Sequence, residues 1–477
     1  MKKGLIVRRG LFGFIFELCA ILCFWIVTPA QQPQPQSLKL TDAVGLALTN
    51  YPAIRASRAQ AAAAREGITL ARTSFIPRTD MLWQQNRATR NNVFGLLLPQ
   101  GVIPSMSGPV LLDQSSQGVW GSAGGVLLTW EPVDFGLRKA QVNLARAQTN
   151  QADARVEVTR LDVATAASDA FLTLLAAQQS VRAAQANVDR LQVFAKSVHV
   201  LVDNQLRPGA DASRADAELA AAQVQLIQAQ QTSEVTRITL GEALGAPTPP
   251  LSVETGPLLD MPPEAPALAY AADSHPLALE QSAAVDTERA RVEILERSYF
   301  PRFSFQASVF GRGTGALVDG RFEGGLNGLV PSTGNWATGL SVSFPLMDIF
   351  SIRSRRRIEA RNEAAERARY DQTILALRAQ DARAQAVIES AIRIAHTTPV
   401  ELKAAQEAEV RARARYEAQL ANITEVADAE RLLTQAEIDD AIARLGVWRA
   451  RLAAAKVRGD LKPFLQDVAN APGRKKE

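Results

Sequence analysis

Tyr51-Pro52-Ala53-Ile54 begins one segment, which ends with Ser74-Phe75-Ile76-Pro77-Arg78. A second, similar segment begins with His275-Pro276-Leu277-Ala278 and ends with Ser298-Tyr299-Phe300-Pro301-Arg302. In both segments, the second proline follows the first by 25 positions. Two more similar stretches follow, Trp130-Glu131-Pro132-Val133-Asp134-Phe135-Gly136 and Phe344-Pro345-Leu346-Met347-Asp348-Ile349-Phe350, and each opens a long run of helix-forming residues. The chain is therefore duplicated internally, and its halves have the same order of parts.

A third pair of similar stretches lies near the turns of these long runs. Gln205-Leu206 recurs as Gln419-Leu420, and Ala215-Asp216-Ala217-Glu218 recurs as Ala427-Asp428-Ala429-Glu430. We therefore predict a signal peptide at 1–30, a first structural repeat at 31–264, a second at 265–462 and a C-terminal tail at 463–477. Each repeat is expected to contain a helix, a strand pair and a long helical hairpin, and a linker ends the first.

The first thirty residues have the composition of an export signal. Four basic residues precede a mostly apolar run from Leu11 to Val27, and Thr28-Pro29-Ala30 follows it. This order of charge, apolar core and small residue predicts export with cleavage after Ala30. Two alternatives remain open: Arg8-Arg9 belongs to a twin-arginine signal, or Cys23 carries a lipid.

The charge balance and the cysteines exclude several classes of function. Removing the signal takes four bases and Glu17 from totals of 53 and 49, which leaves 49 basic and 48 acidic residues. This near-neutral balance argues against a nucleic-acid-binding surface. Cys19 and Cys23 both lie inside the signal, so the mature chain has no thiol. The three histidines show no metal-ligand spacing, and His275 is expected to cap a helix. We expect no cofactor, no bound metal and no enzymatic activity.

Alternation of apolar and polar residues predicts two strand pairs. It is clear from Phe303 to Val309 and from Leu340 to Phe344, and weaker before Trp130. Trp120 lies ten residues before Trp130 on the same face, which corresponds to about 25 Å of height in a tilted strand, as in an outer-membrane apolar band. We predict that both belong to the aromatic girdles of a membrane barrel. The alternative is a soluble β-sandwich with two buried tryptophans.

The long runs predict a coiled coil. Between Gly136 and Pro208, 71 residues contain no glycine or proline, which as one helix would extend about 105 Å. Apolar positions from Ala170 to Val202 alternate in steps of four and three, which predicts left-handed supercoiling. The returning helices, 211–244 and 425–459, are about half as long. We expect helix 267–298 to stack end to end on the first and helix 40–75 to stack on the second. Pro399 predicts a kink or a short break in the second long run.

Taken together and in order, these duplicated motifs resemble the TolC family of outer-membrane efflux proteins, also called outer membrane factors. The resemblance covers about Leu38 to about Lys462 and rests on the Tyr-Pro and His-Pro helix starts, the Ser-aromatic-x-Pro-Arg stretches, the Pro-Val-Asp and Pro-Leu-Met-Asp stretches and the alanine-rich returning helices. It implies an α+β membrane protein in which three chains, each with four strands, form one twelve-stranded outer-membrane β-barrel. A long periplasmic α-helical coiled-coil barrel continues below it.

The resemblance also assigns the site residues. The periplasmic tips, which in the family contact an adaptor or the inner-membrane transporter, map to Gln205, Leu206, Pro208, Gly209, Gln419 and Leu420. The usual tip glycine is a glutamine in both copies. Glu425 and Asp428 lie three residues apart and match the segment whose acidic residues ring the closed pore entrance. Six carboxylates at a threefold axis would favour cations and raise their own pKa values. The alternative is a solvated helix face with Thr424 as its N-cap.

We therefore expect a passive exit duct of a tripartite efflux or type I secretion system, in the outer membrane and extending into the periplasm. Its expected partners are two further copies of the chain, a periplasmic adaptor (membrane fusion) protein, an inner-membrane transporter and outer-membrane lipid. A soluble periplasmic coiled-coil scaffold or adaptor is the alternative. The cluster Arg353, Arg355, Arg356 and Arg357 predicts a solvated helix start near the membrane rim, with anionic lipid headgroups as an alternative contact.

Overall fold

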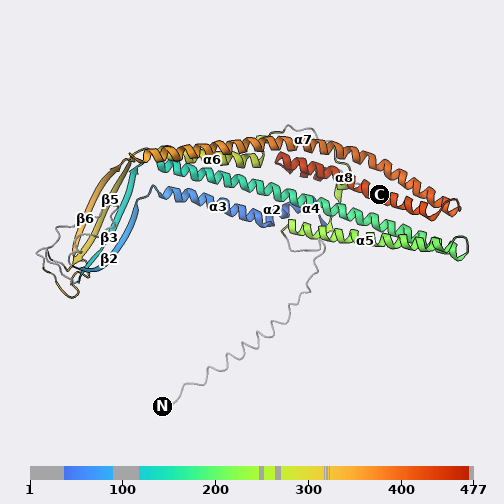
Figure 1. Cartoon of the computed structure of the whole chain (residues 1–477), viewed down its shortest axis with the longest axis horizontal. Helices are drawn as coiled ribbons and strands as arrows, with labels where there is room; N and C mark the ends of the chain where they lie inside the picture. Colours follow the sequence, from blue (N-terminus) through green and yellow to red (C-terminus); the bar gives the residue numbers. More distant parts are fainter. Residues whose placement is uncertain are drawn as a thin grey trace, which may run out of the picture.

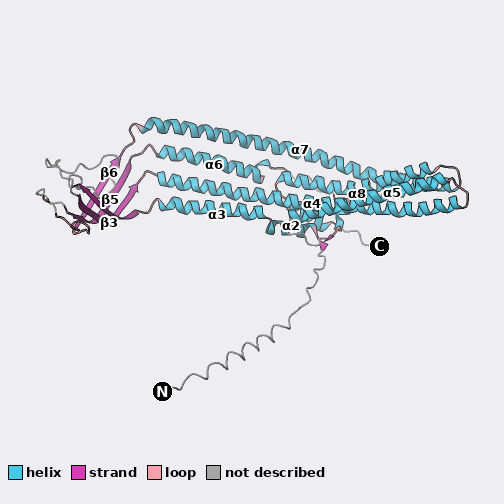
Figure 2. Cartoon of the chain, turned by 60° about the horizontal axis from the view of Figure 1, so that its bottom comes forward, coloured by secondary structure: helices cyan, strands magenta, loops and turns pink. Residues whose placement is uncertain are grey.

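The computed structural model describes residues 37–89, 118–245, 252–263, 270–315, 317, 321 and 323–471. The predicted signal peptide, with Cys19 and Cys23, lies outside the described residues. Six helices form an elongated body with a four-stranded sheet at one end and two helical turns at the other (Figures 1 and 2). They are α3 (Pro52–Thr73), α4 (Leu137–Asp203), α5 (Gly209–Ala243), α6 (Pro276–Arg297), α7 (Asp348–Glu417) and α8 (Ile423–Arg458).

The long glycine- and proline-free run forms a single helix, as predicted. α4 has 67 residues and α7 has 70, which corresponds to about 100 Å each. The returning helices α5 and α8 have 35 and 36 residues, so each spans only the half nearer the turns. None of the helices in the described ranges is long and apolar enough to cross a membrane.

The predicted end-to-end stacking of the shorter helices paired the wrong ends. Gly245 lies two residues after the end of α5, and a Cβ atom there would lie 3.1 Å from the Cα of Tyr51, so α5 meets the start of α3. Gly459 is the C-cap of α8, and a Cβ atom there would lie 2.6 Å from the Cδ of Pro276, so α8 meets the start of α6. Length did not distinguish the two pairings, because α3 and α6 both have 22 residues. Both glycines adopt positive φ, which ends an α-helix without a side-chain clash.

His275 holds the junction between α8 and α6. Its Nδ1 accepts a hydrogen bond from the Leu277 N–H at 3.1 Å, which confirms the predicted cap, and its Nε2 lies 3.1 Å from the Lys456 carbonyl oxygen. The first contact leaves the ring proton on Nε2, so the neutral imidazole satisfies both helix ends. Burial lowers the pKa of His275, and the Lys456 carbonyl only partly opposes this shift.

This cap is expected to make stability depend on pH. Because the pKa of His275 is lower in the folded than in the unfolded chain, protons bind preferentially to the unfolded chain as the pH falls. The contribution of His275 to the stability of the fold is therefore complete above about pH 6.5 and is lost as the pH falls below that value. We expect the unfolding midpoint to drop between pH 7.5 and 5.5. A His275→Ser variant, which retains a capping oxygen, is expected to show a smaller drop. Comparing the two proteins also removes the opposite contribution of His199, whose pKa Asp216 raises.

Pro399 does not break α7. The helix continues from Asp348 to Glu417 with Pro399 inside it. Neighbouring threonines stabilise this stretch: Thr397 Oγ1 donates to the Arg393 carbonyl at 2.9 Å, and buried Thr398 donates to the Asp440 carboxylate on α8 at 3.2 Å. The predicted short break is therefore wrong, because packing on α8 holds the helix on both sides of the proline.

The sheet is antiparallel, with the order β2 (Arg78–Thr89), β3 (Gly118–Val133), β5 (Arg302–Thr314) and β6 (Thr333–Ser343). Directly paired residues share a face. One row across the four strands is Met81, Val126, Val309 and Trp336, and the opposite face carries the row Gln84, Ala123, Arg312 and Thr333. Met81, Val309 and Trp336 are 84%, 69% and 75% exposed. The sheet thus has an uncovered apolar face and a polar face.

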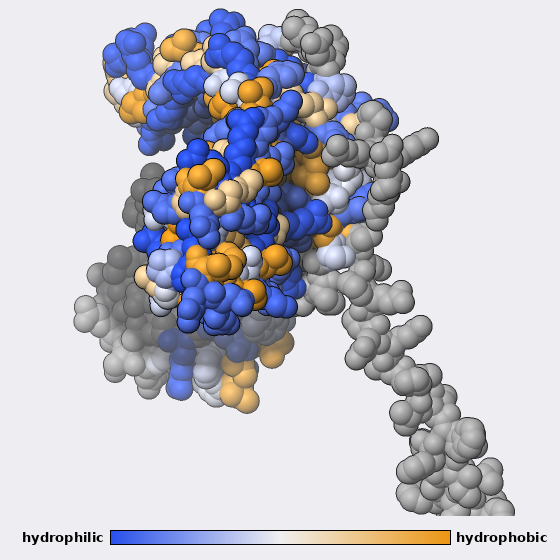
Figure 3. Space-filling model, turned by 90° about the vertical axis from the view of Figure 1, so that its right-hand side faces the viewer, coloured by the Kyte–Doolittle hydropathy of each residue, from blue (hydrophilic) through white to orange (hydrophobic). Residues whose placement is uncertain are grey.

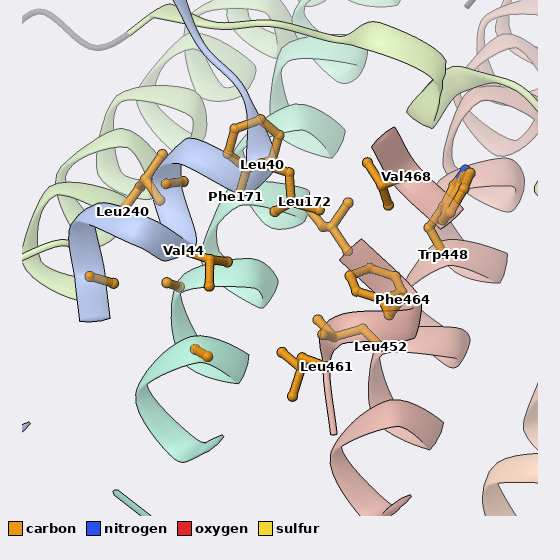
Figure 4. Packing of buried hydrophobic residues seen from close by; sticks show 14 of the residues in the cluster. Leu40, Val44, Phe171, Leu172, Leu240, Trp448, Leu452, Leu461, Phe464 and Val468 are labelled. Carbon is orange, nitrogen blue, oxygen red and sulfur yellow. The ribbon is translucent and has the colours of Figure 1, made fainter. Parts of the chain in front are cut away.

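The main core lies midway along the helices, on one face of α4. α2 (Leu40–Asn50), the strands β1 (Ser37–Leu38) and β4 (Ser252–Val253), the 3₁₀ turn η2 (Gly256–Leu259) and α9 (Lys462–Asn470) form an additional layer there. Phe171, Leu172, Leu240 and Trp448 are fully buried in this cluster (Figure 4). The predicted C-terminal tail begins inside α9, whose Phe464 and Val468 are buried in the same cluster.

The helices form a curved wall with two free edges. α4 packs between α3 and α5 on one side and α6 and α8 on the other, and α7 packs on α6 and α8. In the described part of the chain, the outer sides of α5 and α7 have no neighbouring helix, although both helices expose apolar residues such as Ile227 (63%) and Val387 (54%). β2 and β6 are likewise the edges of the sheet. A single chain therefore leaves both lateral edges of the helical wall and both edges of the sheet unpaired.

Candidate pore constriction and docking tips

The two helical turns at the end opposite the sheet have the same backbone geometry. Gln205 and Gln419 adopt left-handed φ values of 60° and 63°. The following N–H groups, of Leu206 and Leu420, each donate to the carbonyl five residues back, on Leu201 and Arg415, at 2.8 Å. This is the Schellman arrangement that usually places glycine at the left-handed position. The glutamines therefore replace glycine in sequence without changing the turn.

The left-handed glutamines predict opposite effects for two substitutions. A side chain in this conformation costs about 1 kcal/mol relative to glycine. We expect Gln419→Gly to stabilise the protein by up to about 1 kcal/mol, and Gln419→Val, whose branched Cβ tolerates positive φ poorly, to destabilise it by about 1–2 kcal/mol. Denaturant titration of both variants measures this. A Gly variant that is less stable than the parent would show that the turn is not left-handed.

The predicted tip residues lie at the surface of this end. Leu206 and Leu420 are 54% and 70% exposed, Pro208 precedes α5, and Gly209 is its first residue. Figure 3 faces this end and shows hydrophobic residues in separate patches on a mainly hydrophilic surface. The cap of α8 is Asn422, whose Oδ1 accepts the Glu425 N–H at 3.0 Å, so the proposed Thr424 cap is wrong. Thr424 lies inside α8, one residue after its start.

Three side chains tie the two hairpin tips together; we call them the tip latch. Tyr416, 1% exposed at the end of α7, donates its hydroxyl hydrogen to the Asp211 carboxylate on α5 at 3.0 Å. The Arg207 guanidinium lies 4.1 Å from the centre of the Tyr416 ring and donates to the Tyr416 carbonyl oxygen. Burial, with the hydrogen bond to Asp211, raises the pKa of Tyr416 to about 12. The phenol therefore stays neutral and remains a donor at physiological pH.

Glu425 and Asp428, the predicted ring residues, both lie exposed on one face of α8. Glu425 Oε2 is 3.8 Å from Arg415 Nε, and Asp428 is paired with Arg431 one turn further on. The neighbouring positions 426, 427, 429 and 430 are buried. Packing thus turns these two carboxylates away from the protein's own core.

A buried charged cluster lies just above the tips, between α4, α7 and α8. Glu430 on α8 is 1% exposed and bridges two arginines, Arg190 on α4 at 3.0 Å and Arg413 on α7 at 2.6 Å. Arg190 also pairs with Glu437 at 3.0 Å, and Arg413 with Glu409 at 2.7 Å. Burial raises the pKa of Glu409, and the nearby Glu430 raises it further against the effect of Arg413. We call these five residues the Glu430 cluster.

Trp120 and Trp130 both lie on β3, as predicted. The Trp130 Nε1–H donates to the Phe75 carbonyl oxygen at 3.3 Å, which places this ring where the sheet meets the helices. Trp120 lies towards the other end of the strand, 5.4 Å from the Arg87 guanidinium. The two rings thus occupy the two ends of the sheet.

The sequence did not single out the residues that join elements. Tyr416, Arg207 and Glu430 act through partners 200 or more positions away or on another helix. One signal was present: Tyr416 is one of only five tyrosines in the chain and stands three residues before a tip. Among the described residues, no group of three His, Cys, Asp or Glu side chains is placed to hold a metal ion.

The model of a known family matches both halves of the chain, at residues 43–246 and 268–459, and its description is outer membrane efflux protein. This chain belongs to that family. Each match covers one predicted structural repeat almost completely. The protein is therefore an outer-membrane efflux channel that extends into the periplasm, and the four-stranded sheet with its long helices is the fold of such channels.

Solved structures agree with this fold. The outer-membrane channel OprN is 22% identical, over 88% of this chain and 89% of its own, with a TM-score of 0.70. The Campylobacter jejuni channel CmeC is 13% identical, over 91% of this chain and 90% of its own, with a TM-score of 0.70. The Neisseria gonorrhoeae channel MtrE, solved in an open state, is 17% identical, over 88% of this chain and 89% of its own, with a TM-score of 0.70. A search of curated proteins found no match.

Proposed function

We propose that this chain is the homotrimeric exit duct of a tripartite efflux or type I secretion system. The open edges of its sheet carry the proposal. Four strands are too few to enclose a water-filled lumen, whereas twelve strands suffice. β2 continues from α3 at one edge and β6 leads into α7 at the other, so one edge of each chain can pair with the opposite edge of the next.

The helices support the same assembly. The exposed apolar residues of α7 and α5 lie on the two sides of the wall, where a neighbouring chain would cover them. Head-to-tail contacts of this kind close into a ring. The apolar sheet face then meets lipid, with Trp120 and Trp130 at the two interfaces, and the polar face lines the lumen.

Gel mobility and bilayer recording test this proposal. We expect the unboiled protein to migrate as a trimer from the outer-membrane fraction and to form ion-conducting channels in planar bilayers. A soluble monomer without conductance would refute the duct.

The duct itself catalyses no reaction in this proposal. An inner-membrane transporter supplies energy and selects the substrate, and a periplasmic adaptor contacts the tips at Leu206, Pro208, Gly209 and Leu420.

Glu425 and Asp428 are proposed to line the constriction of the closed tip. Their exposure on one face of α8 supports this role, because three copies would place six carboxylates around the axis. We expect Glu425→Ala/Asp428→Ala to lower the permeability ratio of cations over anions towards one and to change the single-channel conductance. Glu389→Ala/Glu401→Ala, which removes two exposed carboxylates of α7 away from the tip, serves as the matched control. Unchanged selectivity would refute the ring.

A further inference from the structure

We propose that four exposed basic residues near the sheet bind the phosphate groups of anionic phospholipids. They are Arg72 at the end of α3, Lys139 in the first turn of α4, and Arg353 and Arg357 near the start of α7, and we call them the basic collar. At 1.5 Å per residue, all four lie within about 15 Å of the helix ends that adjoin the sheet. The inference rests on the proposed placement of the sheet in the membrane.

The collar residues of α3 and α4 share one face of the wall. Arg65 on α3 and Asp153 on α4 form an ion pair at 2.7 Å. Arg72 lies one heptad beyond Arg65 and Lys139 two heptads before Asp153, and heptad spacing keeps side chains on one face of supercoiled helices. Ala167 lies two heptads after Asp153 on α4 and is fully buried in the main core, which also contains residues of α2 and α9. Arg72 and Lys139 therefore lie on the face that carries this additional layer.

The collar residues of α7 lie on the corresponding face of that helix. Arg353 and Arg357 precede Ile374 and Arg378 by three heptads. Those two residues line a cleft of about 560 Å³ beside Tyr270, next to the 3₁₀ turn η3 (Ala272–Ser274), which belongs to the connection between the two repeats. In a closed tube, an additional layer from three chains fits only outside, because inside it would fill the lumen. The collar therefore faces outwards.

The collar has positive charge that the protein does not neutralise. Two other arginines at the same level are paired, Arg138 with Asp134 at 3.0 Å and Arg356 with Glu296 at 2.7 Å. In the described ranges, none of the four collar residues forms an ion pair, and all four are exposed. Arg357 donates one long hydrogen bond to Ser354 at 3.4 Å, and the other donors of the collar are available to an external anion.

The order of residues along the axis indicates a lipid. Exposed apolar residues of the connecting turns separate the apolar sheet face from the collar; they include Ile76 (66%), Phe135 (44%), Leu346 (68%) and Met347 (83%). A bilayer leaflet has the same order: acyl chains would meet the sheet face, the interface would meet the connecting turns, and the lipid phosphates would meet the collar. A free phosphate ion would require no apolar border. The chemistry therefore fits an anionic phospholipid of the periplasmic leaflet, such as phosphatidylglycerol.

Lipid retention tests the collar. The full-length protein is placed in mixed micelles or nanodiscs of phosphatidylcholine with phosphatidylglycerol, and native mass spectrometry counts each lipid bound per trimer. We expect preferential retention of phosphatidylglycerol and a higher unfolding midpoint in its presence. In Arg72→Gln/Lys139→Gln/Arg353→Gln/Arg357→Gln, retention is expected to fall on the order of tenfold.

Matched variants make the outcomes decisive. Lys196→Gln/Arg383→Gln/Arg393→Gln/Lys403→Gln removes the same charge from exposed positions far from the sheet and is expected to retain the lipid; equal losses in both variants overturn the proposal. If the collar variant does not assemble, Arg72→Lys/Arg353→Lys/Arg357→Lys is expected to retain phosphatidylglycerol.

An equal rise of the unfolding midpoint with soluble glycerophosphate would show a free-phosphate site instead. A collar variant that loses lipid but still conducts leaves the duct intact, whereas a wild-type protein that binds lipid without conducting refutes the duct alone.

Discussion

Replacing Glu430 with alanine is expected to destabilise the helical body by about 3–5 kcal/mol, because removal of one partner from a buried ion pair leaves the other charges uncompensated. Glu430 is 1% exposed, whereas Arg190 and Arg413 retain 22% and 30% of their side-chain exposure. Partial access of water to the arginines places the expected loss near the lower end of that range. The loss appears as a lower denaturation midpoint of the trimer in detergent.

Two variants calibrate this result. Glu430→Gln keeps the shape and one acceptor oxygen, and we expect it to lose less than the alanine variant. Glu407→Ala breaks the exposed ion pair between Glu407 and Arg411, which both lie on α7 at 3.0 Å from each other. Exposed ion pairs contribute less than about 1 kcal/mol to stability. A loss as small in Glu430→Ala as in Glu407→Ala would show that the Glu430 cluster does not hold the three helices together.

Breaking the tip latch is expected to open the channel. Tyr416→Phe removes the hydrogen bond to Asp211, and Asp211→Ala removes its acceptor; each hydrogen bond to a charged group stabilises by about 1.5–3 kcal/mol. The latch joins the α4–α5 hairpin to the α7–α8 hairpin below the Glu430 cluster. With the latch lost and the cluster intact, the tips can separate while the helices above remain packed. We expect a severalfold higher single-channel conductance and greater entry of large antibiotics into cells.

Asp216→Ala is the matched control for the latch. Asp216 lies on α5 as Asp211 does, but it pairs with His199 of the same hairpin at 2.8 Å. Its removal loosens no contact between hairpins, so the conductance is expected to stay unchanged. If Asp216→Ala raises the conductance as much as Asp211→Ala, general loosening of α5 explains the effect and the latch does not control opening.

The tip latch and the Glu430 cluster differ in the number of charges that they contain. The latch contains one tyrosine, one arginine and one carboxylate, joined by two hydrogen bonds and by the contact of Arg207 with the Tyr416 ring. The Glu430 cluster contains three carboxylates and two arginines on three helices. Separating these charges is costly in a poorly solvated site. We therefore expect movement during opening to be concentrated below Glu430.

Sequence alone determined the features that depend on local chemistry. The absence of glycine and proline from 137 to 207 predicted α4, and the two-residue alternation around Phe305 and Val342 predicted β5 and β6. Helix and strand periods differ, so these patterns are legible without neighbours. The duplication then predicted that both halves fold alike, and the left-handed turns at Gln205 and Gln419 agree with that, since both have the same hydrogen bonds.

Only the tertiary structure decided how these parts meet. Two helices of equal length competed for each stacking position, and the contacts of Gly245 with Tyr51 and of Gly459 with Pro276 decided between them. The burial of Glu430 and the partner of Tyr416 depend on helices distant in sequence, because a side chain's solvation is set by what packs around it and not by its neighbours in the chain. The sequence determined the elements of this channel, and long-range packing decided which residues join its two hairpin tips.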